Sequence, residues 1–365
     1  MVSKAAYFRF HKYLGLIGAA FLLVQSLTGL TLVFRSRTAQ LLDPAGMISG
    51  PGNVDASPAK LLAAAEPLYP GFHVDRLVYP ERVDGTYIVY LANTNGNKRY
   101  VSLDRHSAAV LRSGQIWKFP VIAADQIHYE WLFGIPGTIL ICTIGIMLLL
   151  IATLGICFWW PRRGRVRKSL TVQWRIAPRA VLRQLHRTIG VTASAFVAFM
   201  AITGLFVAVP IVLDGPPPRW STTESFAPKI GPALKLAESQ FPGKAIRDVR
   251  MQAPSRIAVF LFAPERNPMA VHRVIVDPRG PSILSVRDAF HDDEAWVVAL
   301  PLHDGEDFGF AGEIVVAFIG LFLATLASTG PIMWFQARRA RRRTGRAPAR
   351  AASKQRLKAE VGSSL

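Results

Sequence analysis

The segment "FHKYLGLIGAAFLLVQSLTGL", residues 10–30, has a counterpart 175 residues later in "LHRTIGVTASAFVAFMAITGL", residues 185–205. Both begin with a histidine followed by a basic residue, continue as an uncharged, mostly apolar run, and close on Thr-Gly-Leu. A helix of about 20 apolar residues is long enough to cross the hydrocarbon core of a bilayer. The pair therefore predicts two spanning helices and an internal repeat.

A second pair of segments repeats at the same offset. "IHYEWLFGIPGTILICTIG", residues 127–145, parallels "LHDGEDFGFAGEIVVAFIG", residues 302–320, and both carry a histidine ahead of an apolar run. A composition with 51% hydrophobic residues agrees with a membrane protein. Four runs have the length of a spanning helix: Leu14–Phe34, Ile135–Trp160, Ile189–Leu213 and Ala311–Phe335.

The net charge of +19 is concentrated in three places. About half of the 43 basic residues lie in the first 12 residues, in residues 161–187 and after residue 336, where Glu360 is the only acid. This positive-inside pattern predicts that both termini and residues 161–187 are cytoplasmic. We therefore interpret the basic tail as a topology signal that contacts anionic lipid, and not as a nucleic-acid site. The first apolar run exceeds the about 7 to 15 residues of a signal-peptide core, so we expect it to be retained.

Two outside segments lie between the spans. Each contains a helical pattern that ends at Pro-Gly and alternating runs such as "GTYIVYLA" and "SRIAVFLFA", which predict one helix on a short antiparallel sheet. The fold class is an α-helical membrane protein with four transmembrane helices from a parallel duplication (2 + 2) and two α+β outside domains. The predicted order is residues 1–34 (cytoplasmic start and first span), 35–127 (first outside domain), 128–160 (second span), 161–187 (basic connection), 188–213 (third span), 214–302 (second outside domain), 303–336 (fourth span) and 337–365 (basic cytoplasmic tail).

Four of the eight histidines occupy repeat-matched positions, His11 with His186 and His128 with His303. The predicted topology puts the first pair at the cytoplasmic face and the second at the outer face, so the layers are separated by roughly the membrane thickness of about 30 Å. One histidine at a membrane edge more often caps a helix or meets headgroups. Two facing imidazoles, however, are what a non-covalent, b-type bis-histidine haem requires, whereas zinc or copper usually takes three or four close ligands. The pattern favours two such haems.

Further residues near these histidines are candidates for supporting roles. Glycines that could admit a macrocycle are Gly15, Gly190, Gly134 and Gly309, and the two Thr-Gly pairs, Thr28–Gly29 and Thr203–Gly204, favour close helix packing. An acidic group near the outer pair could attract a cationic chelate, although a solvated rim explains it equally well. Its members are Asp304, Glu306, Asp307, His291, Asp292 and Asp293.

The chain resembles the PepSY-associated transmembrane helix family in "FHKYLGL", "LHRTIGV", "LTGL", "ITGL", "IHYEWLFG" and "LHDGEDFG", over nearly its whole length. The resemblance implies a multi-pass protein of the bacterial inner membrane, with periplasmic PepSY-like outside domains and two haems. Their ligands would be His11 with His186 and His128 with His303. Within this family the chain is similar to the siderophore (ferrioxamine) reductases, so we expect an oxidoreductase that reduces a ferric siderophore in the periplasm.

The electron source is expected to be external, a cytoplasmic reductant or the quinol pool, because no dinucleotide-binding fingerprint is present. Reduction would release ferrous iron, which binds hard oxygen ligands more weakly than ferric iron. Two alternatives remain open. One is a di-haem electron conduit to another periplasmic acceptor, and the other is a haem-free protein whose PepSY-like domains bind or transport a peptide or chelate.

Overall fold

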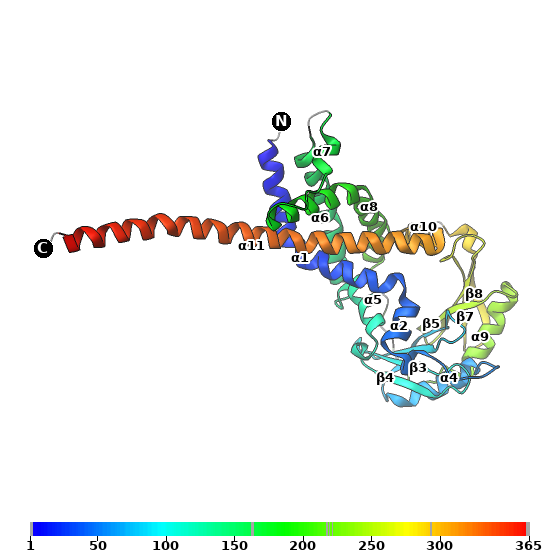
Figure 1. Ribbon diagram of the computed structural model, residues 1–365. Coiled ribbons are helices and arrows are strands. Elements are labelled where there is room, and N and C mark those ends of the chain that lie inside the picture. The colour runs from blue at the N-terminus through cyan, green and yellow to red at the C-terminus, as the bar shows by residue number, and fades with distance from the viewer. Residues whose placement is uncertain are drawn as a thin grey trace. The chain divides into compact units, whose positions relative to one another are not determined.

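A computed structural model describes residues 3–161, 164–216, 218, 220, 222–292 and 294–362, with side chains to residue 340 (Figure 1). The α-helices are α1 (Lys4–Val33), α2 (Arg35–Leu42), α3 (Pro44–Met47), α4 (Pro58–Ala65), α5 (Pro120–Glu130), α6 (Ile135–Trp159), α7 (Val166–Leu170), α8 (Pro178–Asp214), α9 (Ala227–Gln240), α10 (Ala295–Asp304) and α11 (Gly309–Gly362). The strands are β1 (His73–Val78), β2 (Tyr87–Ala92), β3 (Lys98–Leu103), β4 (Val110–Gly114), β5 (Ile246–Ala253), β6 (Arg256–Phe262), β7 (Val271–Asp277) and β8 (Ser282–Arg287).

Within the described residues, four helical segments are long and apolar enough to span a membrane. They are α1, α6, α8 and the segment Glu306–Ala340. Each matches one of the predicted apolar runs, with only Phe34 and Trp160 lying one residue beyond α1 and α6, so the prediction of four spanning helices is confirmed. The basic segments at the ends of α8 and α11 continue the helices beyond the apolar runs, because Ala, Arg and Leu favour helix. The helix α8 begins at Pro178, and proline is suited to the first helical turn.

The chain divides into two compact units, each containing part of these four helices. The first unit comprises Met1–Ser26, Ile146–Ala201 and Ile319–Leu365. The second comprises Leu27–Gly145 and Ile202–Phe318, and it includes every strand. His11 and His186 both belong to the first unit, and His128 and His303 both belong to the second, so each histidine pair lies within one unit.

All eight strands form one antiparallel sheet in the order β4-β3-β2-β1-β5-β6-β7-β8. Each outside segment supplies four strands, and β1 pairs with β5 where the two sets meet, with Leu77 opposite Val249. The sequence predicted two separate domains, and the structure differs on this point. An unpaired β1 or β5 would expose a row of backbone donors and acceptors, which their pairing satisfies.

One apolar core holds α4 and α9 against the same face of this sheet. Alternate strand residues such as Leu77 and Val249 meet Leu61 of α4 and Ile230 of α9, and all four side chains are fully buried. The helix α4 begins at Ser57, whose side chain accepts a hydrogen bond from the Lys60 amide. The two outside segments therefore fold around a shared core, with one helix from each, as expected.

His128 lies in the short helix α5 and not at the start of a spanning helix as predicted. The helix α5 ends at Trp131, which adopts a left-handed conformation (φ 47°), and α6 follows after a tight turn. A Cβ atom on Gly137 of α6 would collide with the Glu130 carbonyl. Glycine at this position therefore lets the two helices approach each other closely enough to make the turn.

The same arrangement recurs 175 residues later. His303 lies in α10, which ends at Gly305 with a left-handed φ of 88°. A Cβ atom on Gly312 of α11 would collide with the Gly305 carbonyl. Both outer histidines are thus carried on short helices that are folded against the start of a spanning helix.

Candidate functional site

The inner histidine pair joins α1 and α8. The rings of His11 and His186 have centroids 6.5 Å apart and planes inclined by 78°. Nδ1 of His11 donates a hydrogen bond to the Ile151 carbonyl at 2.8 Å, because a carbonyl can only accept. Nδ1 of His186 lies 2.7 Å from Oγ1 of Thr329, whose hydroxyl already donates to the Thr325 carbonyl. Both rings therefore carry their proton on Nδ1, so their Nε2 atoms can act as metal ligands.

The outer pair repeats this pattern with α5 and α10. The centroids of His128 and His303 are 6.3 Å apart, and the planes are inclined by 53°. Oγ1 of Thr28 lies 3.1 Å from Nδ1 of His128, and Oγ1 of Thr203 lies 3.0 Å from Nδ1 of His303. Nδ1 is therefore engaged in all four rings, and any coordination of a metal would use Nε2.

The spacing within each pair fits one metal ion between two imidazoles. A metal–imidazole bond is about 2.0–2.1 Å and the nitrogen lies about 1.1 Å from the ring centre, so ligands on opposite sides place their centroids about 6.3 Å apart. The observed separations are 6.5 and 6.3 Å. The part of the chain that the structure describes contains no group of three or more His, Cys, Asp or Glu residues suited to a metal ion. Two protein ligands suffice for haem, since the porphyrin supplies the other four.

A glycine from another helix lies against each ring. A Cβ atom on Gly155, Gly29 or Gly204 would lie 3.1 Å from Cε1 of His11, His128 or His303, respectively, which is a tight contact. The corresponding distance from Gly330 to Cε1 of His186 is 3.8 Å. A larger side chain at the first three positions would displace the ring, so these glycines help to set where each imidazole lies.

The four glycines that the sequence singled out have little or nothing packed where a side chain would lie. No described heavy atom lies within 4 Å of a Cβ built on Gly15, Gly134 or Gly309, and a Cβ on Gly190 would meet only Leu326, at 3.6 Å. Gly15 is one helical turn beyond His11, on the same face of α1.

A buried donor also lacks an acceptor near the inner pair. Nε1 of Trp159, one turn beyond Gly155 on α6, has no hydrogen-bond partner in the described residues. An unsatisfied buried donor costs about 1–3 kcal/mol, which a bound acceptor would offset. The ligand atoms, the open positions and this donor fit a haem.

A family model described as PepSY-associated TM region matches residues 8–337. The chain belongs to the PepSY-associated transmembrane family. The matched range includes all four paired histidines and the whole sheet. Among curated proteins, none matches the chain.

Three predicted substrate residues of this PepSY-associated protein lie at the end of α10 and just beyond it. Glu306 forms an ion pair with Arg35 at 3.2 Å, and Arg35 also approaches Glu81 at 3.6 Å. Burial and the neighbouring Glu306 charge raise the pKa of Asp304 to about 7, whereas Asp307 is exposed. Much of the negative charge expected here is therefore neutralised or weakened.

The other predicted substrate residues lie between β8 and α10. Asp292 is buried and pairs with Arg287 at 3.5 Å, while His291 is exposed. Asp293 lies outside the described residues. No contact joins these residues to Asp304 or Glu306, so the structure does not gather the predicted acidic group into one site among the residues it describes.

The hydrogen-bond partners of the histidines were not predicted from the sequence. Thr28 and Thr203 were expected to serve close helix packing first, although each lies 100 residues before the histidine that it contacts. Their repetition at the 175-residue offset was the signal that could have identified them. The Ile151 carbonyl leaves no such signal, because every residue carries one.

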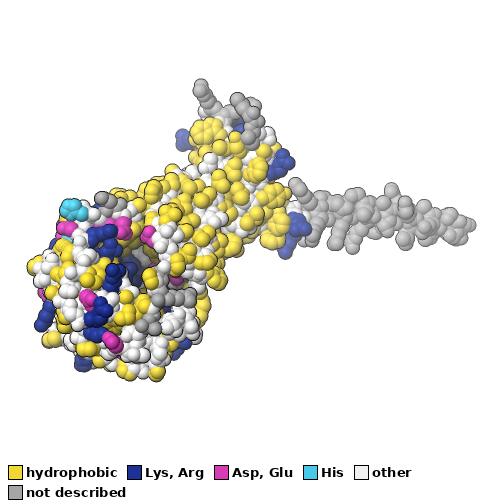
Figure 2. All heavy atoms as spheres, turned by 180° about the vertical axis from the view of Figure 1, so that it is seen from behind, with side chains coloured by type: hydrophobic (Ala, Val, Ile, Leu, Met, Phe, Trp, Pro, Cys, Tyr) yellow, Lys and Arg dark blue, Asp and Glu magenta, His cyan; other side chains and the backbone are white. Residues whose placement is uncertain are grey.

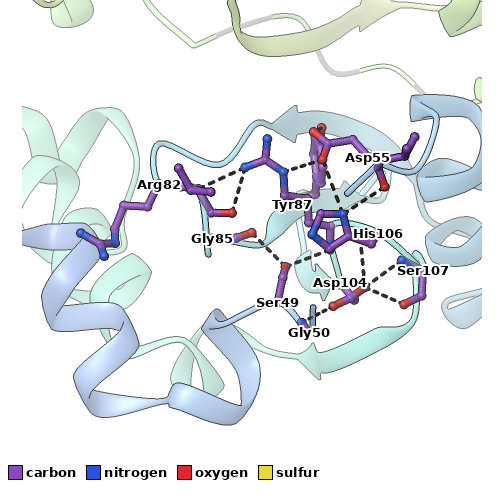
Figure 3. A network of polar contacts seen from close by, with 12 residues as sticks. Ser49, Gly50, Asp55, Arg82, Gly85, Tyr87, Asp104, His106 and Ser107 are labelled. Carbon is purple, nitrogen blue, oxygen red and sulfur yellow. Dashed lines mark hydrogen bonds and ion pairs between the residues drawn. The ribbon is translucent and has the colours of Figure 1, made fainter. Parts of the chain in front are cut away.

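Two of the unpaired histidines, His106 and His272, have structural roles. His106 belongs to a polar network that ties the loop before α4 to the β3–β4 turn (Figure 3). Its Nδ1 donates to the Val54 carbonyl at 3.0 Å, and Asp104 accepts from the Gly50 amide at 2.6 Å. The buried His272 stacks on Phe241 with centroids 3.9 Å apart.

Proposed function

We propose that this protein is a di-haem b-type electron-transfer protein of the bacterial inner membrane that reduces ferric siderophores in the periplasm. His11 and His186 would hold the inner haem, and His128 and His303 the outer haem. The observation that carries the proposal is the pair of imidazole separations, 6.5 and 6.3 Å, with Nδ1 engaged in all four rings. A haem held between two imidazoles supplies reversible one-electron transfer when bound.

The residues around the histidines orient the ligands. A hydrogen bond at Nδ1 fixes the ring and increases the basicity of Nε2, and such partners commonly change metal affinity about 10- to 100-fold when removed. The matched Thr28–His128 and Thr203–His303 contacts, 175 residues apart, support a parallel duplication. Such a duplication places equivalent residues at equal depth on both halves.

The charge pattern supports the direction of the reaction. Basic termini and a basic connection favour a cytoplasmic location for these segments, which leaves the sheet and the outer histidine pair on the periplasmic side. One electron from a cytoplasmic reductant or a quinol converts ferric to ferrous iron. The ferrous ion then leaves the chelate, because its lower charge binds hard oxygen donors less strongly.

The visible spectrum of the purified protein tests the ligand assignment. We expect a Soret band, a reducible α band and two haems per chain. His303→Ala should lose one haem and keep the other, because each iron depends on its own pair. The exposed His291 provides a matched control, and His291→Ala should keep both. A wild-type protein without a Soret band, or full haem content in His303→Ala, would contradict the proposal.

The acceptor requires a separate experiment. Protein reduced with dithionite under anaerobic conditions is mixed with ferric siderophores while the α band is followed. We expect reoxidation together with the appearance of ferrous iron, trapped by a ferrous-specific chelator. If no siderophore reoxidises a haem-loaded protein, the conduit to another periplasmic acceptor replaces the reductase.

A further inference from the structure

The sheet carries a cluster of arginines on the face opposite α4 and α9. Asp248 of β5 is fully buried there and accepts hydrogen bonds from Nε of Arg76 (3.0 Å), Arg250 (2.7 Å) and Arg247 (3.0 Å). We call these four residues the arginine cluster. It lies where β1 meets β5, so both outside segments contribute to it.

The arginine cluster has more positive than negative charge. Arg76 stands directly opposite Arg250 across the β1–β5 pair, an arrangement that is unfavourable without a compensating anion. Asp248 supplies one negative charge to three guanidinium groups. The charge of Asp125, on α5, also acts on Arg76, but Asp125 makes no hydrogen bond to the cluster within the described residues, and burial raises its pKa. A net positive charge therefore remains.

The guanidinium groups keep donors available for another acceptor. Arg76 and Arg250 use only Nε for Asp248, and within the described residues their terminal nitrogens make no hydrogen bond. Arg247 also donates to the Met269 carbonyl at 3.3 Å. The terminal nitrogens of a guanidinium form a planar fork that matches a carboxylate, so two such forks remain for a ligand.

Aromatic rings help to hold these forks in place. The guanidinium carbon of Arg250 lies 4.5 Å from the ring centroid of Phe260, and that of Arg76 lies 5.7 Å from the ring of Tyr90. The side chains of Arg76 and Arg250 remain 29% and 41% exposed, so a ligand can reach them. Figure 2 shows Lys and Arg side chains, with a few acidic ones, gathered around a hollow in the part of the molecule that carries the sheet.

The helix α5 carries His128 of the outer pair and belongs to the same unit as the arginine cluster. Tyr129 follows His128 directly, and the charges of both Arg247 and Asp304 act on it. All of these residues belong to the second unit, and the cluster therefore lies on the same side as the outer pair.

We propose that the arginine cluster binds a carboxylate of an anionic ferric chelate and so selects substrates whose iron is held by carboxylate or hydroxycarboxylate groups. This inference rests on the proposed function and names its substrate class. It assigns substrate recognition to arginines, in contrast to the sequence expectation of a cationic chelate at an acidic group. Two half-buried guanidinium forks beside a single buried carboxylate are the observation that carries it.

Reoxidation rates with two chelates of opposite charge test the selection. Dithionite-reduced full-length protein is mixed under anaerobic conditions with ferric citrate, which is anionic, or with ferrioxamine B, which is cationic. We expect Arg250→Gln and Arg76→Gln to reduce the rate of reoxidation by ferric citrate about tenfold. The rate with ferrioxamine B should stay unchanged or rise, because each substitution removes a positive charge that attracts the anionic chelate and repels the cationic one. The control is Arg256→Gln, an exposed arginine on the neighbouring strand β6, which should behave as wild type.

Binding of a redox-inert analogue separates this inference from the proposed function. Gallium citrate binding to the oxidised protein, measured by equilibrium dialysis, needs no electron transfer. We expect weaker binding in Arg250→Gln than in Arg256→Gln. Equal binding by these two variants overturns the inference, whether or not the protein reduces iron.

A haem propionate would present the same carboxylate chemistry to the arginine cluster. In that case Arg250→Gln would lower the haem content or slow both chelates equally, and the cluster would not be a substrate site. Unchanged haem content together with a loss confined to ferric citrate supports binding of the chelate.

Discussion

At the scale of single residues, the hydrogen bond at Nδ1 is the common feature of the four paired histidines. In the outer pair, Nδ1 contacts a threonine hydroxyl in both rings. In the inner pair, Nδ1 contacts a backbone carbonyl in one ring and a threonine hydroxyl in the other. The imidazoles were predictable from their repeated positions. The identity of the inner acceptors was not, because Ile151 contributes only its backbone, and its contact with His11 depends on how α1 and α6 pack.

Removing one hydroxyl should weaken the outer site selectively. Thr203→Val keeps the side-chain shape but removes the hydroxyl that contacts Nδ1 of His303. We expect the affinity for the proposed outer haem to fall about 10- to 100-fold. Thr203→Ser should restore it. Haem content and redox titration provide the measurement, with Thr192→Val as the control on the same helix, since Thr192 bonds only to the backbone of its own helix. Equal haem loss in both valine variants would mean that the effect is general destabilisation.

Asp248 should make the sheet sensitive to acid. Burial alone would raise the pKa of Asp248, but the charges of Arg76, Arg250 and Arg247 outweigh it and hold the pKa far below its ordinary value. A group with a lowered folded-state pKa stabilises the fold above its unfolded pKa, about 3.9, and this contribution is lost as the pH falls below that value.

We therefore expect the unfolding midpoint, followed by circular dichroism of the sheet, to drop as the pH falls below about 4. Asp248→Asn should lower the midpoint at neutral pH, because removing one partner of a buried ion pair costs about 3–5 kcal/mol, and it should flatten the acid dependence. Asp277→Asn, at an ion pair with the exposed Arg279, serves as the comparison and should lower the neutral midpoint less than Asp248→Asn does. An acid slope in Asp248→Asn as steep as in the wild type would contradict this prediction.

At the scale of elements, the decisive feature is the pairing of β1 with β5. The alternating runs and the Pro-Gly endings were enough to predict strands and one helix in each outside segment. They could not reveal that the two sets of strands join, because strands that pair with a neighbour and strands at a free edge have the same alternation. The short helices α5 and α10 were not predicted as separate elements, because they are only 11 and 10 residues long and each precedes a spanning helix by a few residues.

Hydrogen exchange should distinguish the single sheet from two separate ones. We expect backbone amides in β1 and β5 to exchange more slowly than those in β4 and β8, because the inner strands are paired on both sides and the outer strands on one. Exchange followed by mass spectrometry of the full-length protein resolves these strands. Protection of β1 and β5 no greater than that of β4 and β8 would indicate two domains that separate in solution.

At the scale of the whole molecule, the length of the apolar runs and the distribution of basic residues predict the membrane topology. The four spans were predictable because a bilayer demands long apolar helices, and basic segments indicate the cytoplasmic side. Each histidine pair draws its members from the two halves of the sequence, so neither pair exists before the chain has folded completely. The repeat offset identified the partners, but only the structure supplies their separation.

Site-directed labelling should establish the orientation of the chain in the membrane. In a background with Cys142→Ala and Cys157→Ala, a membrane-impermeant maleimide should label Val83→Cys in intact spheroplasts, because Val83 is exposed in the segment assigned to the periplasm. Trp174→Cys, exposed in the basic connection, should react only after permeabilisation. Labelling of the second variant in intact spheroplasts would reverse the proposed topology.

The junction of β1 and β5 also bears on stoichiometry. Half of this chain would supply one member of each histidine pair and would leave β1 or β5 unpaired at the edge of its strands, so it could complete a histidine pair only by meeting a second copy. A homodimer of that kind would assemble according to its concentration in the membrane. Here both partners are supplied by one polypeptide, so cofactor loading is expected to stay the same when the protein is scarce.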